Sequence, residues 1–255
     1  MAARAARWAG QKGFGVRLSW GPAGIEALAH EVAVLVLVDV LRFGTALDVA
    51  TASGAAVRPA PWPFDPEDQP AHGGAVEVAD GSGRRRLGLS PGSLAVLGPD
   101  DLIVLPSANG SHCSALAARS GAVVVAASLR NATAVARYAA RVRGPGAVGV
   151  VPCGEVWPGG GLRPAVEDLL GAGAVVAALT AAPPSRSCAP EAAAAMAAFC
   201  ACDDLAAALG ESESGRELRD KGLSGDVAWA AALDVSNAVP VLGADGAYRS
   251  ERLGV

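Results

Sequence analysis

Aromatic side chains are scarce in this chain: Phe, Trp and Tyr together make up 4% of its 255 residues. Charged residues are also few, at 18%, whereas hydrophobic residues reach 51%, much of it Ala and Val. A composition of this kind can bury a large core, which excludes an intrinsically disordered protein. The length suits one large domain or two small ones.

A strongly basic surface is also missing. The net charge is −4 at pH 7, and the sequence pI is about 5.4. The one dense basic run, Arg84 to Arg86, is too short for the extended positive face that nucleic-acid binding needs. We therefore expect no nucleic-acid partner.

Cysteine usage and apolar runs exclude two further classes of protein. The five cysteines are an odd set without the spacing of a disulfide framework or a zinc site, so we expect reduced thiols in a cytoplasmic protein. The basic N-terminus lacks the apolar segment of a secretory signal, and no apolar run reaches the ~20 residues of a membrane helix. The cysteines are Cys113, Cys153, Cys188, Cys200 and Cys202.

Three common enzyme motifs are absent. There is no GxxxxGK[ST] phosphate loop, no GxGxxG fingerprint after a strand and no GxSxG nucleophile elbow. His30, His72 and His112 are scattered, and a catalytic histidine needs a positioned partner that the sequence does not show. An active site must therefore be built from other residues.

What the chain does contain is a buried strand followed by charged residues. Val32 to Val38 is an unbroken apolar run, which predicts a strand covered on both faces at the centre of a parallel sheet. Asp39 and Arg42 follow, and Thr45 is expected to cap a helix that ends at Gly54. Ligands of open α/β sheets gather at such strand ends, where helix N-termini offer N–H groups to anions. The simpler alternative is that Asp39 and Arg42 pair and hold the turn.

Strand and helix patterns alternate along the rest of the chain. This predicts an α/β fold with a mostly parallel or mixed sheet and flanking helices. We place one unit at residues 14–250, either undivided or made of two closely joined lobes at about 14–100 and 101–250. A flexible arm is expected at residues 1–13.

Two loops and the C-terminal elements complete the prediction. Residues 61–75 are rich in Pro and Gly and are expected to form a loop, as are residues 156–163. Near the C-terminus we expect one long helix over residues 190–209, a last strand at 238–242 and a tail from residue 246.

Several predicted strands end in polar residues, which converge if the strand ends share one edge of the sheet. Asp80 is added by a glycine-rich turn, and Glu167 and Asp168 by the first turns of a helix. Acids are also favourable at helix starts because of the helix dipole alone. Besides Asp39 and Arg42, the strand-end groups are Ser107 and Asn109, then Ser128, Arg130 and Asn131, then Cys153 and Glu155.

Such a set of side chains suits metal-assisted hydrolysis of a phosphate ester. Carboxylates hold Mg²⁺, arginine grips phosphate with a bidentate fork, and asparagine with free helix N–H groups completes an anion cradle. Cys153 is a second candidate nucleophile, and its plainer interpretation is a small buried hydrophobe.

Several segments, taken in order, resemble the 2-phosphosulfolactate phosphatase (ComB-like) family over roughly residues 16–243. Each motif is short, and their order and spacing carry the resemblance. The segments are VDVLRFGTAL at 38–47, Asp80-Gly81 leading to Leu89-Ser90-Pro91, Ser107-Ala108-Asn109-Gly110-Ser111, Asn131-Ala132-Thr133-Ala134-Val135-Ala136, Cys153-Gly154 with Glu167-Asp168, and Ser214-Gly215-Arg216 through Asp226-Val227, Asp234 and Val239-Pro240.

The resemblance implies a magnesium-dependent phosphatase of two joined α/β lobes. Its implied reaction, on the route to coenzyme M, is hydrolysis of 2-phospho-3-sulfolactate to 3-sulfolactate and phosphate. The implied metal ligands are Asp39, Asp80 and Glu167. Catalytic candidates are Asp39, Arg42, Asn109, Asn131 and Cys153, and substrate-binding candidates are Arg42, Ser107, Asn109, Gly110, Ser128 and Asn131.

Departures from the family pattern keep an alternative open. Asp80 stands at a Glu position, Ser107 and Ala108 at Thr positions, Gly44 at a Ser or Thr position, and Leu89 where the family has Asn. The changes around Asp80 and Ser107 motivate a second hypothesis, a catalytically weakened member that binds an anionic metabolite or a protein partner. A third hypothesis is a hydrolase that acts through Cys153. A homodimer is also open.

Overall fold

Unbroken apolar runs form the centre of the sheet, as predicted. The structure, a computed structural model, describes residues 8–61, 75–80, 83–181 and 187–251, with the backbone alone at 61, 75–80 and 83–86. Strand β2 (Val34–Val38) is buried along its whole length and pairs in parallel with β7 (Val123–Ala127) and β8 (Val148–Pro152). Strand β1 (Val16–Leu18) extends this block by pairing in parallel with β8.

The sheet continues beyond β7 into a second block. Its strand order is β1-β8-β2-β7-β11-β12-β3-β6-β4-β5, and β3 and β6 pair in parallel while the other contacts beyond β7 are antiparallel. The sheet is therefore mixed, which confirms the predicted α/β class. The strands of the second block are β3 (Ala56–Pro61), β4 (Ala75–Asp80), β5 (Gly83–Gly88), β6 (Leu102–Ser107), β11 (Pro240–Leu242) and β12 (Tyr248–Ser250).

The predicted tail from residue 246 is wrong, because part of it forms β12. Tyr248 gives the reason: its ring is fully buried and meets the Phe43 ring edge-on at a centroid distance of 6.5 Å. The Tyr248 hydroxyl lies 2.8 Å from Oγ of Ser114, so its hydrogen bond is satisfied. A buried aromatic side chain thus anchors a segment that has no apolar periodicity of its own.

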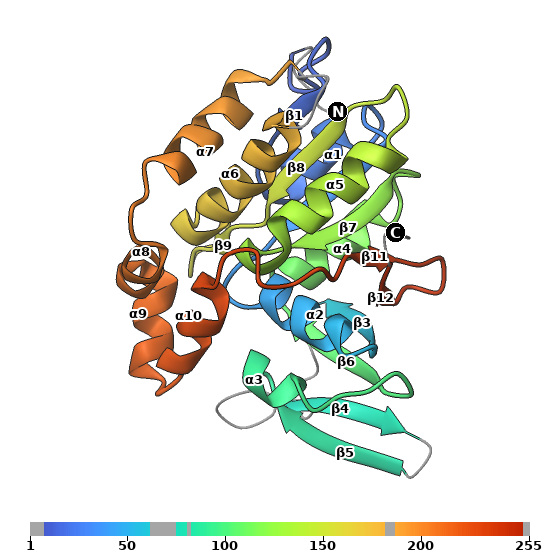
Figure 1. The fold of residues 1–255 in the computed structure, drawn as a ribbon, viewed down its shortest axis with the longest axis vertical. Coiled ribbons are helices and arrows are strands. Elements are labelled where there is room, and N and C mark those ends of the chain that lie inside the picture. The colour runs from blue at the N-terminus through green and yellow to red at the C-terminus, as the bar shows by residue number, and fades with distance from the viewer. Residues whose placement is uncertain (1–7, 62–74, 81–82, 182–186, 252–255) are drawn as a thin grey trace.

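Helices cover both faces of the parallel block (Figure 1). Helices α5 (Ala132–Val142), α6 (Val166–Ala181) and α7 (Pro190–Cys200) pack on one face, and α1 (Gly21–Leu28) and α4 (Gly110–Ala117) pack on the other. Helix α2 (Phe43–Ala52) packs against β3, β7 and β12, where the two blocks meet.

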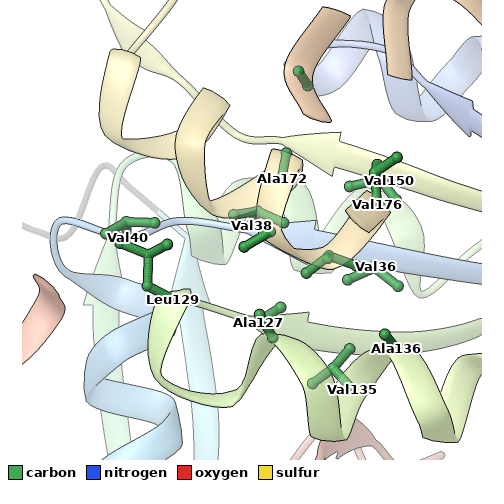
Figure 2. Packing of buried hydrophobic residues seen from close by; sticks show 14 of the residues in the cluster. Val36, Val38, Val40, Ala127, Leu129, Val135, Ala136, Val150, Ala172 and Val176 are labelled. Carbon is green, nitrogen blue, oxygen red and sulfur yellow. The ribbon is translucent and has the colours of Figure 1, made fainter. Parts of the chain in front are cut away.

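Successive side chains of β2 point to opposite faces of the sheet and so belong to two different core clusters. Val34, Val36 and Val38 belong to the core cluster under α5 and α6, whereas Leu35 and Leu37 belong to the cluster under α1 and α4. Figure 2 shows the first of these clusters. Side chains of β2, β7 and β8, and of the turns that follow β2 and β7, pack there against side chains of α5 and α6: Val36, Val38, Val40, Ala127, Leu129, Val135, Ala136, Val150, Ala172 and Val176.

The predicted single helix over residues 190–209 is wrong. The chain forms α7 and then α8 (Leu205–Glu211), bent by 107°. Asp204 accounts for the break, since its side chain accepts the N–H of Ala207 at 2.9 Å and so caps a new helix. Among the described residues, no single helix combines the length and hydropathy of a membrane crossing, and this bent pair passes that test by length and composition only.

Short elements complete the architecture. The residues predicted as a loop at 156–163 contain parts of a two-stranded antiparallel hairpin, β9 (Glu155–Val156) with β10 (Leu162–Arg163). Strands from before and after residue 100 share the main sheet, because β3 pairs with β6 and β2 pairs with β7. The remaining elements are α3 (Pro91–Leu94), η2 (Leu129–Asn131), α9 (Glu213–Asp220) and α10 (Ser224–Ala231).

Candidate active site

A cavity of about 190 Å³ lies at the C-terminal end of β2. It brings together four side chains that the sequence singled out: Asp39, Arg42, Ser107 and Asn109. Glu155 and the apolar side chains of Leu41, Phe43 and Leu89 also line it. We refer to it as the β2 cavity.

The two strands that meet at this cavity run in opposite directions. The ladder between β7 and β3 contains three antiparallel steps, so β6 is antiparallel to β2. The convergence therefore does not follow from a single row of parallel strand ends. It depends on α4, which follows β6 and brings Gly110 against Phe43 and Asp39. A Cβ at Gly110 would collide with the Phe43 ring and lie 2.7 Å from Oδ2 of Asp39, so this approach requires glycine.

Gly44, which departs from the family pattern, is the residue that this tight turn requires. A Cβ at this position would collide with the carbonyl oxygen of Ala127 and lie 2.5 Å from that of Asp39. The prediction that Thr45 caps α2 is wrong. The hydroxyl of Thr45 instead donates a hydrogen bond to the carbonyl of Val40 at 2.8 Å. Both residues thus shape the tight turn between β2 and α2.

Asp39 is a buried acid held at the start of α2. Its side chain is 6% exposed, and Oδ1 accepts the N–H of Phe43 at 3.1 Å. Burial raises the pKa of Asp39 from 3.8 to about 7, and repulsion from Glu155 and Glu167 adds to this, while the N–H groups of Phe43 and Gly110 oppose it. Asp39 is therefore poised to exchange a proton, or to bind a cation, near neutral pH.

Two adjacent acids at the start of α6 have different surroundings. Asp168 accepts the N–H of Val40 at 2.7 Å and that of Gly154 at 2.8 Å, so it ties the end of β2 to the turn after β8. Burial, followed by repulsion from Asp39 and Glu167, raises the pKa of Asp168 well above its usual range. Glu167 is only 2% exposed, and none of the described residues hydrogen-bonds to its carboxylate. Asp168 is thus a structural clamp, and Glu167 is the acid with free ligating capacity.

Arg42 pairs with a distant residue rather than with Asp39. Its Nη1 lies 2.6 Å from Oδ2 of Asp226 in α10, and the same oxygen accepts a hydrogen bond from Oγ of Ser90 at 3.1 Å. The alternative that Asp39 and Arg42 pair to hold the turn is therefore wrong. Arg42 still lines the β2 cavity, so its remaining N–H groups are available there.

Asn109 and Glu155 form one wall of the cavity. Nδ2 of Asn109 donates to Oε2 of Glu155 at 2.6 Å. Burial raises the pKa of Glu155, against the lowering effect of this hydrogen bond. Ser107 caps the start of α4, since its Oγ accepts the N–H groups of Asn109 at 3.2 Å and of Gly110 at 3.1 Å.

Ser128 and Asn131 do not line the cavity, in contrast to the prediction. Both are fully buried, and they cap the turn after β7: the N–H of Ser128 donates to Oδ1 of Asn131 at 2.9 Å, and Oγ of Ser128 accepts the N–H of Arg130. Nδ2 of Asn131 donates to the carbonyl of Ala238 at 3.1 Å. Because neither side chain reaches solvent, we assign both a structural role.

Cys153 has the surroundings of a structural thiol. It is buried beside Cys113, and a hydrogen bond with that residue, followed by burial, raises its pKa well above the usual range. A neutral, buried thiol is a poor nucleophile. The geometry therefore favours the plainer interpretation of Cys153 and weighs against hydrolysis through this residue.

Asp80 was predicted to be a metal ligand, but the register of β4 on β6 does not bring it to the site. Its side chain lies outside what the structure describes, but its backbone is at the end of β4, where the neighbouring Ala79 pairs with Leu102 at the start of β6. Ser107, at the other end of β6, is five residues further on, which corresponds to roughly 17 Å of strand. Figure 1 shows the β4–β5 hairpin at the lower edge of the sheet. We therefore drop Asp80 from the ligand set.

The remaining acids suit a magnesium ion by donor type. Among the residues that the structure describes, no three Asp, Glu, His or Cys side chains are arranged as a metal site. Mg²⁺ usually keeps several waters and takes only one or two protein carboxylates. Asp39 and Glu167 are both buried and repel each other. A divalent cation bound by both carboxylates would offset this repulsion, so the pair fits such an ion by donor type.

Two contributors were missed as site residues in the sequence. Glu155 appeared among the strand-end groups without a role, and Asp226 only as part of a family-like segment. Asp226 has no local signal, because an acid in the first turn of a helix is expected from the dipole alone.

Comparison with known proteins identifies the family. The sequence profile of the 2-phosphosulpholactate phosphatase family matches residues 86–245, which is more than half of the chain. No curated protein matches the chain. The matched region includes Asn109, Glu155, Glu167 and Asp226, and the structure adds Asp39 and Arg42 from the preceding segment. The chain therefore belongs to the 2-phosphosulpholactate phosphatase family and is a phosphoric monoester hydrolase of that kind.

Proposed function

We propose that the β2 cavity is the active site of a magnesium-dependent phosphatase that hydrolyses a small anionic phosphate monoester. The reference substrate is 2-phospho-3-sulfolactate, which would give 3-sulfolactate and phosphate. The observation that carries the proposal is the acidity of the cavity. Asp39 and Glu155 line it, the charge of Glu167 repels that of Asp39, and the guanidinium of Arg42 is already engaged by Asp226.

An anionic substrate cannot enter such a cavity without a compensating cation. Buried like charges repel a phosphate, and the single arginine is partly neutralised by its own partner. Bound magnesium would reverse the local sign and neutralise charge on the phosphoryl oxygens. Asp39 and Glu167 are the two carboxylates that would hold it.

The chain supplies the groups that orient the phosphate. Arg42 has five N–H donors in a planar fork, and Asp226 takes one end of it, so the other end can bind phosphate oxygens. Asn109 presents an amide at the cavity wall. The starts of α2 and α4 add the positive ends of two helix dipoles. These groups hold the phosphate in one orientation, which is the main protein contribution to phosphoryl transfer.

A phosphate-release assay tests the proposal. The chain is assayed on 2-phospho-3-sulfolactate and a panel of small phosphate monoesters, with magnesium and with a chelator. We expect turnover that requires magnesium and falls by at least ~100-fold in Asp39→Asn. Asp203→Asn is the matched control, since Asp203 is exposed and does not line the cavity. Near-normal turnover of Asp39→Asn would remove the assignment.

The second candidate function is binding without turnover. The distance between Asp80 and the β2 cavity favours it, because one carboxylate of the family-like ligand set is displaced. In that case 2-phospho-3-sulfolactate with magnesium raises the unfolding temperature while no phosphate is released. Release of phosphate at a rate above that of Asp39→Asn excludes this alternative.

A further inference from the structure

Two arginines hold the two ends of helix α10. At the start of the helix, Nη1 of Arg42 pairs with Oδ2 of Asp226 at 2.6 Å. Near its end, Nη1 of Arg130 donates to the carbonyl oxygen of Trp229 at 3.0 Å. The two arginines follow neighbouring strands, because Arg42 comes after β2, Arg130 lies in η2 after β7, and β2 pairs with β7. Both ends of α10 are therefore fixed to the parallel block.

The contact of Arg130 with Trp229 is a cap on the end of α10. Carbonyl groups in the last turn of a helix lack a partner within the helix, and an arginine there is also favoured by the helix dipole. The guanidinium of Arg130 lies over the Trp229 ring as well, with its central carbon 5.0 Å from the ring centre. The same ring packs on α3, since a Cβ at Gly92 would lie 3.1 Å from Nε1 of Trp229.

Arg130 also connects α10 back to α2. Its Nε lies 2.7 Å from Oδ2 of Asp48, an acid of α2 whose side chain is fully buried. Arg42 is the N-cap residue of the same helix. Arg130 therefore links α2 to the end of α10, while Arg42 and Asp226 link the start of α2 to the start of α10.

We propose that Arg130 is a positioning residue of the enzyme. It fixes α10 against α2 and thereby holds Asp226 in the place from which that acid orients the guanidinium of Arg42. This inference rests on the proposed function, in which Arg42 binds the substrate phosphate. Arg130 does not line the β2 cavity, so it acts through α10 and not on the substrate itself.

The contacts of Arg130 use properties that distinguish arginine from lysine. Its planar fork lets Nε bind Asp48 while Nη1 binds the carbonyl of Trp229, and its flat face stacks on the indole ring. A cation that only neutralised Asp48 would need neither contact with α10. The side chain of Arg130 is 11% exposed, so water does not readily replace a contact that is lost. This combination indicates that α10 is held in one position.

A double-mutant cycle tests whether Arg130 acts through Asp226. One arm is Asp48→Val/Arg130→Met, which removes the buried pair as a unit, because a lone carboxylate at Asp48 would lose its partner. The other arm is Asp226→Ala, and a fourth protein carries all three substitutions. The readouts are kcat/KM, with magnesium, for the phosphate monoester that the parent hydrolyses fastest, and the Kd of inorganic phosphate with magnesium by calorimetry.

We expect the pair variant to lose ~10-fold or more in kcat/KM, with a matching loss of phosphate affinity, because Arg42 is misplaced. In the Asp226→Ala background the same substitutions should cause no further loss, since the residue through which Arg130 acts is already gone. Losses that multiply in the triple variant would overturn the inference. Parent values in the pair variant would do the same.

The matched control carries the same two substitutions at another arginine–aspartate pair. Asp245→Val/Arg249→Met removes a pair with an N–O distance of 2.8 Å in the β11–β12 hairpin, which does not line the β2 cavity, and it should keep the parent values.

A second variant covers the case in which the pair variant does not fold. Arg130→Lys keeps a positive charge beside Asp48 but presents a point charge in place of the fork. We expect a loss of ~10-fold in phosphate affinity, again absent in the Asp226→Ala background. Parent affinity in Arg130→Lys would contradict the inference.

The two proposals fail in different ways. If inorganic phosphate binds and its affinity follows the cycle while no ester is hydrolysed, the phosphatase falls and the role of Arg130 stands. If the parent hydrolyses an ester and the losses multiply in the triple variant, the role of Arg130 falls alone. Neither turnover nor phosphate binding by the parent would remove both.

Discussion

Nη1 of Arg42 lies 2.6 Å from Oδ2 of Asp226, although 184 residues separate them in the chain. Asp226 is 4% exposed, and it also accepts a hydrogen bond from Ser90, which precedes α3. The guanidinium at the β2 cavity is therefore held by an acid of α10, and Ser90 from a third segment holds that acid in turn. A buried pair of this kind is costly to break, because the remaining charge loses its partner.

Asp226 is expected to position Arg42. In Asp226→Ala the guanidinium loses its partner, and misplacement of a phosphate-binding group by about 1 Å can reduce kcat by ~100-fold. Asp226→Asn keeps an acceptor oxygen for Nη1 and should restore most of the activity. The measurement is kcat and KM for each variant, with inhibition by inorganic phosphate as a separate readout of anion binding.

An exposed acid nearby in the sequence provides the control for that experiment. Asp220→Ala removes the same charge from the end of α9 without touching Arg42 and should behave as the parent. If Asp226→Ala retained the parent kcat and KM, Arg42 would have no part in orienting the substrate.

The neighbouring acids Glu167 and Asp168 should separate metal binding from stability. Asp168→Ala leaves the N–H groups of Val40 and Gly154 without an acceptor, at about 1–3 kcal/mol for each buried donor. Glu167→Gln keeps the shape of the side chain and should instead weaken magnesium binding by ~10-fold or more. Urea denaturation and magnesium titration of activity measure the two effects. Equal losses of stability in both variants would refute the assignment of a structural role to Asp168 and a metal-binding role to Glu167.

The stability of the metal-free protein should fall as the pH rises from about 4 to about 7. The pKa of Asp39 is 3.8 in its usual state and about 7 in the folded protein, so the folded state binds a proton more tightly across this interval. This group contributes stability that is fully present below the lower pKa and lost above the higher one, by about 2–4 kcal/mol. Asp168 and Glu155 shift in the same direction and add to the slope.

Magnesium should compensate this loss. We expect added magnesium to raise the unfolding temperature more at about pH 8 than at about pH 5, because the ion binds the ionised carboxylate. In Asp39→Asn the pH profile of the metal-free protein should be flatter and its stability at about pH 8 higher than that of the parent. Parallel profiles for the two proteins would show that Asp39 does not titrate abnormally.

Gly110 should tolerate no side chain. In Gly110→Ala the new Cβ collides with the Phe43 ring and crowds Oδ2 of Asp39, so α4 must move away from the cavity at a cost of about 1–3 kcal/mol. We expect turnover to fall more steeply than stability. Gly98→Ala is the matched control, since an added Cβ there has no atom within 4 Å. Wild-type turnover in Gly110→Ala would show that the contact between α4 and Asp39 is not needed.

The elements predicted best were those with strong local patterns. The apolar run that ends at Val38 gave a buried central strand, as predicted. The sequence left the role of Cys153 open, because a thiol at a strand end looks the same in sequence whether it is a nucleophile or a buried packing residue. The family resemblance was carried by the order of short motifs, and it is confirmed over residues 86–245.

The local sequence by itself determined that the run ending at Val38 is a buried strand and that Asp39 follows it, because apolar periodicity and chain order act over a few residues. Only the tertiary structure decided which polar residues meet. The antiparallel steps around β11 and β12 and the register of β4 on β6 place Asp80 away from the cavity, while Asp226 reaches it from far along the chain. Strand register and long-range packing depend on the whole sheet at once, and no short stretch of sequence encodes them.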